Sequence, residues 1–276
     1  MTIFDAKTLL CASVANPNRD SPSPYMHNVG YRHLDINMVY VAVEPEPGDL
    51  PAAIEGIRAL GFRGCSVSKP FKQEVVRLVD DLDDAAREIG AVNSILNDGG
   101  RLVGFNTDWI GVCDSVEEVT PLAGKRVVLL GAGGAARAIA WGLKKRGASP
   151  VVFNRSLSRA EKLCRDLEVE LGGTFDDLEP GMAHDVVINA VPLRAHGLEG
   201  RMAVPQGFLR EGSVVLDEIM KPKKTALLRE AERVGAVGIP GIRPLLLQGA
   251  PQFKRFTGKD APLDVMYRAL EELLPE

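Results

Sequence analysis

The fold of this chain is decided by residues 126–136, which read RVVLLGAGGAA. Residues 126–130 form a short, largely apolar and β-branched run, as is typical of a strand buried in a parallel sheet. The residues from Ala135 to Arg146 have the apolar spacing of a helix. A strand, a glycine turn and a helix in this order predict a dinucleotide-binding unit of the Rossmann type.

The small residues of this turn each have a predicted purpose. Gly131 allows the tight turn, Gly133 lets a pyrophosphate approach the backbone, and Ala136 lets the helix pack closely on the strand. The amino end of the helix offers unpaired N–H groups to phosphate. A glycine turn can also simply end a strand, but the flanking strand and helix favour cofactor binding. The predicted cofactor contacts are Gly131, Ala132, Gly133, Gly134 and Ala135.

The end of the next predicted strand, Pro150 to Phe153, indicates which cofactor is bound. It is followed by Asn154-Arg155-Ser156-Leu157-Ser158-Arg159, with no Asp or Glu to hold the ribose hydroxyls of NAD. Two guanidinium groups and a serine suit a 2′-phosphate, which predicts NADP rather than NAD. The alternative is that Ser156 caps a helix and that both arginines are solvated.

The composition is that of an ordinary globular protein with room for two domains. The 276 residues are 45% hydrophobic and 25% charged, and the formal net charge is −4. Because a negative chain without a basic run has no general attraction to nucleic acid or acidic membranes, we expect neither as a partner. The first residues lack a basic and apolar leader, and no apolar run reaches about eighteen residues. We expect a cytoplasmic protein that is a monomer or a homodimer.

Metal chemistry has no support in the sequence. The cysteines lie far apart without CxxC spacing, which predicts reduced thiols rather than a disulfide framework or a zinc site. The histidines form no HExxH pair, so no metal site is predicted. These residues are Cys11, Cys65, Cys113, Cys164, His27, His33, His184 and His196.

Hydrophobic periodicity predicts an α/β protein with two domains. Alternating strand and helix patterns occupy residues 7–108 and again residues 125–240, and the second segment has the pattern of a doubly wound sheet. Helical spacing in residues 244–256 and 263–274 predicts two helices that return to the first domain. The predicted strands of the second segment are residues 127–130, 151–153, 185–189, 214–216 and 237–239.

These patterns set the expected domain boundaries. The first domain is expected to comprise residues 1–108 and 243–276 and to bind substrate. The Rossmann domain that binds NADP is expected to comprise residues 109–242. A ligand cleft between two such domains is the common arrangement, and we expect one here.

Polar residues in the first segment are candidates for substrate binding and catalysis. Ser23 is predicted to cap a helix whose first residue is Pro24, and Ser21 with Ser23 could equally bind a carboxylate at that helix end. A helix is expected to begin near Phe71, so that Lys72 lies in its first turn, where the helix dipole would help to lower its pKa. A solvated surface lysine is the commoner case. Asp108 could cap the next helix and also act in catalysis.

Taken in order, these motifs resemble the shikimate dehydrogenase family along nearly the whole chain. The similar segments are Ser21-Pro22-Ser23-Pro24 with His27-Asn28, Val67 to Lys72, Ile89 to Asn93, Asn106-Thr107-Asp108, Gly131 to Ala136, Asn154 to Arg159, and Gly241 through Gln248 with Phe253.

The resemblance implies an NADP-dependent oxidoreductase that interconverts 3-dehydroshikimate and shikimate, or a close analogue. Lys72 and Asp108 would be the catalytic acid–base pair, and which of them transfers the proton stays open. Ser21 and Ser23 would hold the substrate carboxylate. Ring hydroxyls would be bound by Ser68, Asn93 and Gln248. The implied cofactor contacts beyond the glycine turn are Asn154, Arg155, Ser156, Arg159, Ala190, Val191 and Gly241.

The chain departs from the family's usual residues at several pocket positions. Ser66 replaces an Asn, Ser68 replaces a Thr and Met220 replaces a Tyr, and these changes remove an amide and a phenol that would donate hydrogen bonds. The segment from Asn189 to Leu193 also differs from the family's usual Asn-Ala-Thr-Ser. These departures predict a divergent member.

Several other functions are compatible with the departures. Quinate or an aminated shikimate could be the substrate. The chain could instead be a noncatalytic sensor of a shikimate-type ligand, or another two-domain NADP enzyme such as a folate dehydrogenase. The retained Lys72 and Asp108 favour the dehydrogenase.

Overall fold

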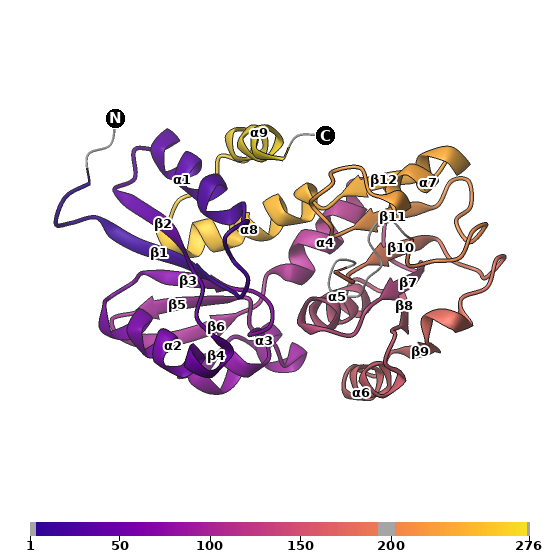
Figure 1. Ribbon diagram of the computed structural model, residues 1–276, viewed down its shortest axis with the longest axis horizontal. Coiled ribbons are helices and arrows are strands. Elements are labelled where there is room, and N and C mark those ends of the chain that lie inside the picture. The colour runs from indigo at the N-terminus through magenta and orange to yellow at the C-terminus, as the bar shows by residue number, and fades with distance from the viewer. Residues whose placement is uncertain (1–3, 193–201, 275–276) are drawn as a thin grey trace. The chain divides into compact units, whose positions relative to one another are not determined.

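The computed structural model describes residues 4–192 and 202–274, and they form two compact units (Figure 1). The first unit comprises Met1–Thr107 and Gln248–Leu273, and the second comprises Asp108–Leu247 and Leu274–Glu276. Each unit contains a six-stranded sheet with helices packed on it. The predicted α/β class with two sheet-containing parts is therefore confirmed.

The sheet of the first unit is mixed. Its strand order is β2-β1-β3-β5-β6-β4, in which β1 pairs in parallel with both β2 and β3, while β5 runs antiparallel to its neighbours. The strands are β1 (Leu9–Val14), β2 (Met38–Val43), β3 (Gly64–Val67), β4 (Asp81–Leu82), β5 (Ser94–Asp98) and β6 (Arg101–Phe105).

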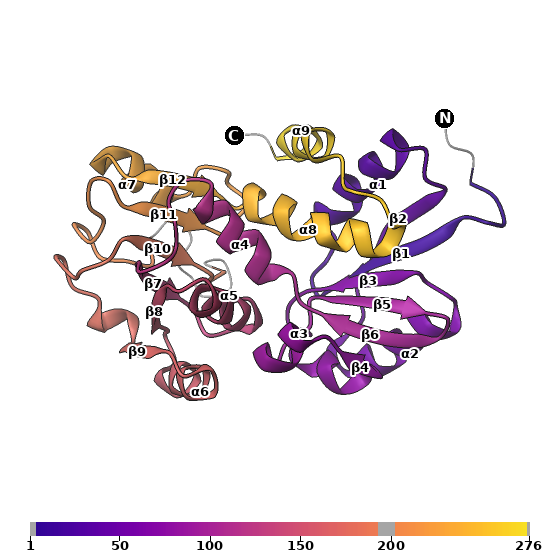
Figure 2. The same cartoon turned by 180° about the vertical axis from the view of Figure 1, so that it is seen from behind.

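The two faces of this sheet are covered by different helices (Figures 1 and 2). The helices are α1 (Ser23–His33), α2 (Leu50–Ala59), α3 (Asp84–Ile89), α8 (Ile242–Thr257) and α9 (Leu263–Leu273). Ala12 and Cys65 share a buried apolar cluster with Ile54 of α2. On the opposite face a side chain at Gly64 would lie 2.5 Å from Phe256 of α8. That face, under α1 and α8, carries Ser66, because Ser66 is two residues after Gly64 in β3.

The second unit has a parallel sheet in the order β12-β11-β10-β7-β8-β9. Counted along this unit, the strands lie in the order sixth, fifth, fourth, first, second, third, which is the Rossmann arrangement. The order reverses between β7 and β10, and ligands of such sheets bind where the order reverses. The strands are β7 (Arg126–Leu130), β8 (Ser149–Phe153), β9 (Glu170–Gly173), β10 (Val186–Asn189), β11 (Val214–Asp217) and β12 (Val237–Pro240).

Apolar clusters on both faces of this sheet make it doubly wound, as predicted. Val127 and Leu129 pack with α4 and α5, whereas the alternate residues Val128 and Leu130 pack with α7. The helices are α4 (Asp108–Glu117), α5 (Gly134–Lys145), α6 (Leu157–Leu167) and α7 (Ala226–Val234). Within residues 4–192 and 202–274, no helix is both long and apolar enough to span a bilayer.

Candidate active site

Gly131 directly follows β7, at the point where the strand order of the second unit reverses. Its φ is +121°, and a side chain there would lie 3.3 Å from the carbonyl oxygen of Ala190, which follows β10. Residues other than glycine rarely adopt this backbone conformation. The tight turn predicted from the sequence is therefore present, and it brings the ends of β7 and β10 into close contact.

The amino end of α5 has the features that a diphosphate group requires. Gly133 precedes α5 and makes no side-chain capping bond, so the first N–H groups of the helix are left for a ligand. A side chain at Gly133 would meet no atom within 4 Å, which leaves open space beside the backbone. Ala136 is 1% exposed and belongs to the core between helix and sheet. These residues fit the phosphates of a dinucleotide.

The loop after β8 and the first turn of α6 each expose a cation. Arg155 and Arg159 are exposed and form no ion pair with any residue in the described part of the chain. Ser156 occupies the capping position of α6, but its hydroxyl lies 3.1 Å from Ser158 Oγ and accepts no bond from the helix backbone. The alternative in which Ser156 caps the helix is therefore wrong, while the solvated arginines leave room for a 2′-phosphate.

This loop is fixed by a side chain that faces its own backbone. Asn154 Nδ2 donates a 2.9 Å hydrogen bond to the carbonyl oxygen of Ser156. The backbone N–H of Asn154 donates to Gly173 of β9. The amide thus holds the turn that carries Arg155.

A buried carboxylate joins the ends of β10 and β11. Asp217 Oδ1 accepts hydrogen bonds from Asn189 Nδ2 at 2.9 Å and from the Ile219 backbone N–H at 3.1 Å. Asp217 Oδ2 accepts from Thr225 Oγ1 at 2.6 Å. Burial raises the pKa of Asp217 above its ordinary value, although the three donors act in the opposite direction. The Asp217 cluster was not predicted, although its signal was a carboxylate at the end of the apolar run Val214 to Leu216.

The Asp217 cluster anchors loops that carry predicted ligand contacts. Asn189 Oδ1 accepts from the backbone N–H of Val191, which lies in the predicted nicotinamide-contacting segment. Ile219 directly precedes Met220, a half-buried residue. A side chain at Gly241 would lie 2.7 Å from the backbone of Glu218, so the end of β12 closely approaches the same loop. Leu193 lies outside the described residues.

In the first unit, α1 begins at Ser23 rather than at Pro24. Pro22 occupies the capping position and no side chain caps the helix, so the predicted capping role of Ser23 is wrong. The proline that precedes the helix cannot offer a side-chain acceptor, and Ser23 lies within the first turn. Within residues 4–192 and 202–274 the hydroxyls of Ser21 and Ser23 form no hydrogen bond. Both half-buried hydroxyls are left for a ligand.

Lys72 lies in a turn and not in the first turn of a helix, so that prediction is wrong. The next regular element is the short 3₁₀ helix Glu74–Leu78, because the Phe71 N–H bonds back to Ser68 and tightens the chain before it. The helix whose dipole was predicted to act on Lys72 is therefore not formed. Its carbonyl oxygen accepts a 2.8 Å bond from the Val92 N–H, which fixes this turn beside β5.

Asn93 is the centre of a buried polar cluster in the first unit. It is 2% exposed, and its Nδ2 donates to Thr107 Oγ1 at 2.9 Å and to Gln248 Oε1 at 3.2 Å. Its Oδ1 accepts from the Thr107 backbone N–H at 2.9 Å. The structure thus brings together two predicted substrate residues, Asn93 and Gln248, from distant parts of the sequence.

The Asn93 cluster is linked to both predicted catalytic residues, to Lys72 through a backbone hydrogen bond and to Asp108 along the chain. Asn93 follows Val92, which binds the Lys72 carbonyl, and Thr107 precedes Asp108. Asp108 is 4% exposed and is the first residue of α4. Gln252, one turn after Gln248, also donates to Thr107 Oγ1 at 3.1 Å. Gln252 was not predicted, and its helical spacing from Gln248 was the available signal.

The two remaining predicted substrate residues lie on and after β3. Ser68 is exposed, and its backbone N–H donates to Val14. Ser66 is half-buried, and its Oγ accepts a 2.6 Å hydrogen bond from the hydroxyl of Tyr40. Tyr40 was not predicted as a site residue.

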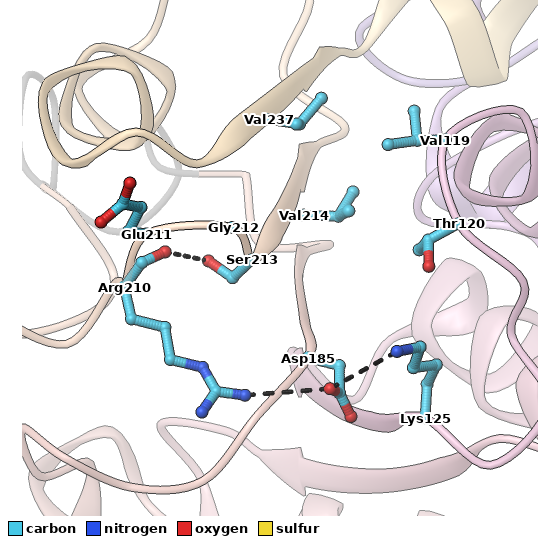
Figure 3. A pocket seen from close by; sticks show the side chains of 10 residues that line it. All are labelled: Val119, Thr120, Lys125, Asp185, Arg210, Glu211, Gly212, Ser213, Val214 and Val237. Carbon is cyan, nitrogen blue, oxygen red and sulfur yellow. Dashed lines mark hydrogen bonds and ion pairs between the residues drawn. The ribbon is translucent and has the colours of Figure 1, made fainter.

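A separate surface recess lies at the amino ends of the parallel strands, at the edge opposite to Gly131 (Figure 3). Its volume is about 380 Å³. Lys125 and Arg210 lie 3.7 and 3.8 Å from the same oxygen of Asp185. None of the predicted site residues lines this recess, and its cations are ion-paired with Asp185.

Within residues 4–192 and 202–274, no three His, Cys, Asp or Glu side chains lie close enough together to bind a metal ion. His196 lies outside these ranges. All four cysteines are free and buried.

Three family models match successive parts of the chain. The "Shikimate dehydrogenase substrate binding domain" matches residues 14–95, and "Shikimate / quinate 5-dehydrogenase" matches residues 115–224. The "Shikimate 5'-dehydrogenase C-terminal domain" matches residues 241–271.

Relatives and solved structures match over nearly the full length. The shikimate dehydrogenase (NADP(+)) of Methanothermobacter thermautotrophicus is 40% identical over 280 residues, with 99% of each chain covered. A crystal structure of a shikimate dehydrogenase in complex with NADP+ is 35% identical and superimposes with a TM-score of 0.93, covering 100% of this chain and 99% of the other. The ligand-free 5-ketofructose reductase of Gluconobacter sp. strain CHM43 is 33% identical, with a TM-score of 0.84 and coverage of 97% and 99%.

Proposed function

Because the chain belongs to the shikimate dehydrogenase family, we propose that it interconverts 3-dehydroshikimate and shikimate, or a close analogue, with NADP as the hydride carrier. It is an oxidoreductase, and its substrate is a small cyclic hydroxy acid. The Asn93 cluster is the observation that carries this proposal. A buried amide that binds Gln248 and holds the segments next to Lys72 and Asp108 suits a site that recognises ring hydroxyls beside an acid–base pair.

The second unit supports NADP as the cofactor. Gly133 leaves space for a diphosphate at the start of α5, and Arg155 and Arg159, which are unpaired within the described residues, offer guanidinium donors to a 2′-phosphate. When bound, NADPH supplies the hydride that reduces the ring ketone. The Asp217 cluster holds the loops with Val191 and Met220, which we assign to the nicotinamide and substrate contacts.

Lys72 and Asp108 are assigned to proton transfer and orientation. In the reducing direction the Lys72 ammonium donates a hydrogen bond to the ketone oxygen and gives up the proton that the new hydroxyl group needs. The Asp108 carboxylate accepts a hydrogen bond from a ring hydroxyl and keeps the reacting carbon oriented. In the oxidising direction Lys72 takes the proton back.

The remaining predicted residues are assigned to substrate binding. Ser21 and Ser23 donate their free hydroxyls to the substrate carboxylate at the positive end of α1. Asn93, Ser68 and Gln248 bind ring hydroxyls. We also assign Ser66 and Met220 to substrate binding, and they offer fewer polar groups than the family usually has at these positions, which suits a substrate that differs slightly from shikimate.

The decisive experiment is steady-state oxidation of shikimate and quinate with NADP and with NAD. Wild type, Lys72→Ala and Lys69→Ala are compared, since Lys69 is an exposed lysine of the same turn. We expect turnover of shikimate with NADP that falls at least about a hundredfold in Lys72→Ala, as removal of a general acid does, and is kept in Lys69→Ala. NADP binding should be unchanged in both. Saturable cofactor binding without turnover of either acid would support a ligand sensor instead.

A second candidate is the reduction of an acyclic or otherwise different polyhydroxy ketone. The similarity to a 5-ketofructose reductase over 97% of the chain favours this option, as do the altered residues Ser66 and Met220. Assay of 5-ketofructose with NADPH beside 3-dehydroshikimate distinguishes the two functions, because the preferred substrate has the higher kcat/KM.

We place this activity in a reducing compartment such as the cytoplasm. All four cysteines are free and their side chains are buried, which is usual for proteins of such compartments. A monomer or a homodimer is our working assignment for the assembly, and light scattering of the purified protein tests it.

A further inference from the structure

Tyr40 and Ser66 face each other across a central strand. Tyr40 lies on β2 and Ser66 on β3, with β1 between them. Cys11 of β1 is in register with both Tyr40 and Gly64, and Ser66 is two residues further along β3. Because side chains two residues apart in a strand point to the same face, Tyr40 and Ser66 lie on one face of the sheet. This is the face under α1 and α8.

The hydrogen bonds of this pair fix the direction of each proton. The backbone N–H of Ser66 can only donate, and it lies 3.3 Å from the Tyr40 hydroxyl oxygen. The Tyr40 hydroxyl therefore accepts there and donates its single proton to Ser66 Oγ, 2.6 Å away. Ser66 Oγ in turn keeps its own proton for another acceptor. Within residues 4–192 and 202–274 the Ser66 hydroxyl has no such acceptor.

Tyr40 is held in place and stays protonated. Asn28 of α1 pairs with the Tyr40 backbone, donating to its carbonyl oxygen and accepting from its N–H, both at 2.8 Å. The ring of His27 stacks on the Tyr40 ring at 4.6 Å between centroids. Burial raises the pKa of Tyr40 well above its ordinary value, so the phenol is a permanent donor at any working pH.

We infer that Tyr40 is a positioning residue that turns the Ser66 hydroxyl into an oriented donor for an oxygen atom of the ring substrate. This inference rests on the proposed function. Ser66 has one proton where an Asn side chain would offer two, so the orientation of that proton decides whether it reaches the ligand. A hydroxyl or ketone oxygen is the chemical group that completes the arrangement.

Removal of the Tyr40 hydroxyl group tests the inference without creating a large cavity in the core, because the aromatic ring is kept. We expect Tyr40→Phe to raise the KM for the ring acid about fivefold, the usual effect of one neutral hydrogen bond, while kcat and the KM for NADP change less than about twofold. Tyr31→Phe is the matched control, because the Tyr31 hydroxyl is equally buried and lacks an oxygen or nitrogen partner among the described residues. Its KM should equal that of wild type.

A double-mutant cycle shows whether Tyr40 acts through Ser66. In a Ser66→Ala background the Tyr40→Phe change should have no further effect on KM, since no hydroxyl remains to be oriented. Monodeoxy analogues of the substrate then identify the oxygen, because only one of them should be bound equally by wild type and Tyr40→Phe.

The outcomes separate this inference from the proposed function. An active wild type whose KM is the same in Tyr40→Phe and Tyr31→Phe would overturn the role of Tyr40 alone, as would additive effects in the cycle. A wild type that turns over no ring acid would overturn the proposed function and the inference with it.

Discussion

Gly131 and Gly133 lie in the same turn but differ in what a methyl group would meet. At Gly131 the φ of +121° and the nearby Ala190 carbonyl make any side chain unfavourable. We expect Gly131→Ala to lower the free energy of unfolding by about 1–3 kcal/mol, measured by denaturant titration. Gly133→Ala should leave stability within about 0.5 kcal/mol of wild type, since its added methyl meets nothing.

The same two variants separate folding from cofactor binding. The methyl of Gly133→Ala occupies the space that we assign to the diphosphate, so the Kd for NADP should rise about tenfold in this folded variant, measured by fluorescence titration. Unchanged NADP affinity in Gly133→Ala would argue against a diphosphate at this turn.

Arg155 is expected to decide between the two nicotinamide cofactors. Loss of a charge-assisted hydrogen bond to a 2′-phosphate should raise the KM for NADP about tenfold or more in Arg155→Ala, with less than a twofold change for NAD. Arg165→Ala serves as the control, because this exposed arginine belongs to the last turn of α6, away from the loop after β8. Equal effects on both cofactors would remove the argument for phosphate recognition.

The role of a single residue was predictable where the backbone conformation alone requires that residue type, as a positive φ requires glycine. The position and purpose of Gly131 follow from the strand that precedes it. Tyr40 and Asp217 could not be found in this way, because their partners Ser66 and Asn189 are far away in the sequence and meet them only across strands. Pro70 predicts a helix start before Lys72, whereas the chain forms a turn there.

Thr225 links the start of α7 to the end of β11. Its Oγ1 accepts from the Leu228 N–H at 3.2 Å as a helix cap and donates to Asp217 at 2.6 Å. Thr225→Val should therefore lower the free energy of unfolding by about 1–3 kcal/mol in a denaturant titration, because the cap is lost and a buried acceptor is left with one donor fewer. Thr225→Ser keeps the hydroxyl and should lose less than half as much. A larger loss in Thr225→Ser, which lacks the methyl group, than in Thr225→Val, which keeps it, would mean that packing of the methyl group, not the two bonds, stabilises this junction.

Secondary structure was predictable where the period of the apolar residues is strong. The five strands predicted for the second unit each overlap an observed strand, and the helix predicted after the glycine turn is α5, shifted by one residue. The missed strand is β9, an edge strand with two glycines and two exposed residues. As an edge strand it pairs only with β8 and is partly exposed, so its residues do not need the apolar alternation from which a strand is predicted.

The stability of the whole molecule should depend on pH through His27. Burial lowers the pKa of His27 to about 3, whereas an unfolded chain protonates histidine near pH 6.5. The unfolded state therefore binds a proton that the folded state does not bind. The contribution of His27 to the free energy of unfolding is fully present above pH 6.5 and is lost as the pH falls from 6.5 towards 3. The expected slope is about 1.4 kcal/mol per pH unit within that window.

His27→Gln should remove this dependence. We expect the variant to be less stable than wild type at pH 7.5 but to lose less of its Tm between pH 7.5 and pH 5, measured by calorimetry. His33→Gln is the control, because His33 is exposed. Asp217 has the opposite effect, because its raised pKa increases the free energy of unfolding as the pH falls. Both histidine variants retain Asp217, so its effect is the same in all three proteins. The same loss of Tm in all three proteins would show that other groups cause the acid sensitivity.

The two-part organisation of the chain was predictable, whereas the composition of the site was only partly so. Two successive α/β patterns gave the class, and the family resemblance supplied residues from both halves. The contact between Asn93 and Gln248 joins residues 155 positions apart, and no local pattern contains it. Hydrogen-bond partners at such separation are set by how α8 packs on the sheet of the first unit.

The register of β1, β2 and β3 has an evolutionary consequence. Because Tyr40 and Ser66 lie on one face and two hydrogen bonds join the Tyr40 hydroxyl to Ser66, the role that we propose for each residue depends on the other. A lineage that replaces Ser66 by a side chain with two donors of its own releases Tyr40 from selection on its hydroxyl. The two positions should therefore covary, with Phe tolerated at position 40 chiefly in descendants that carry Asn at position 66.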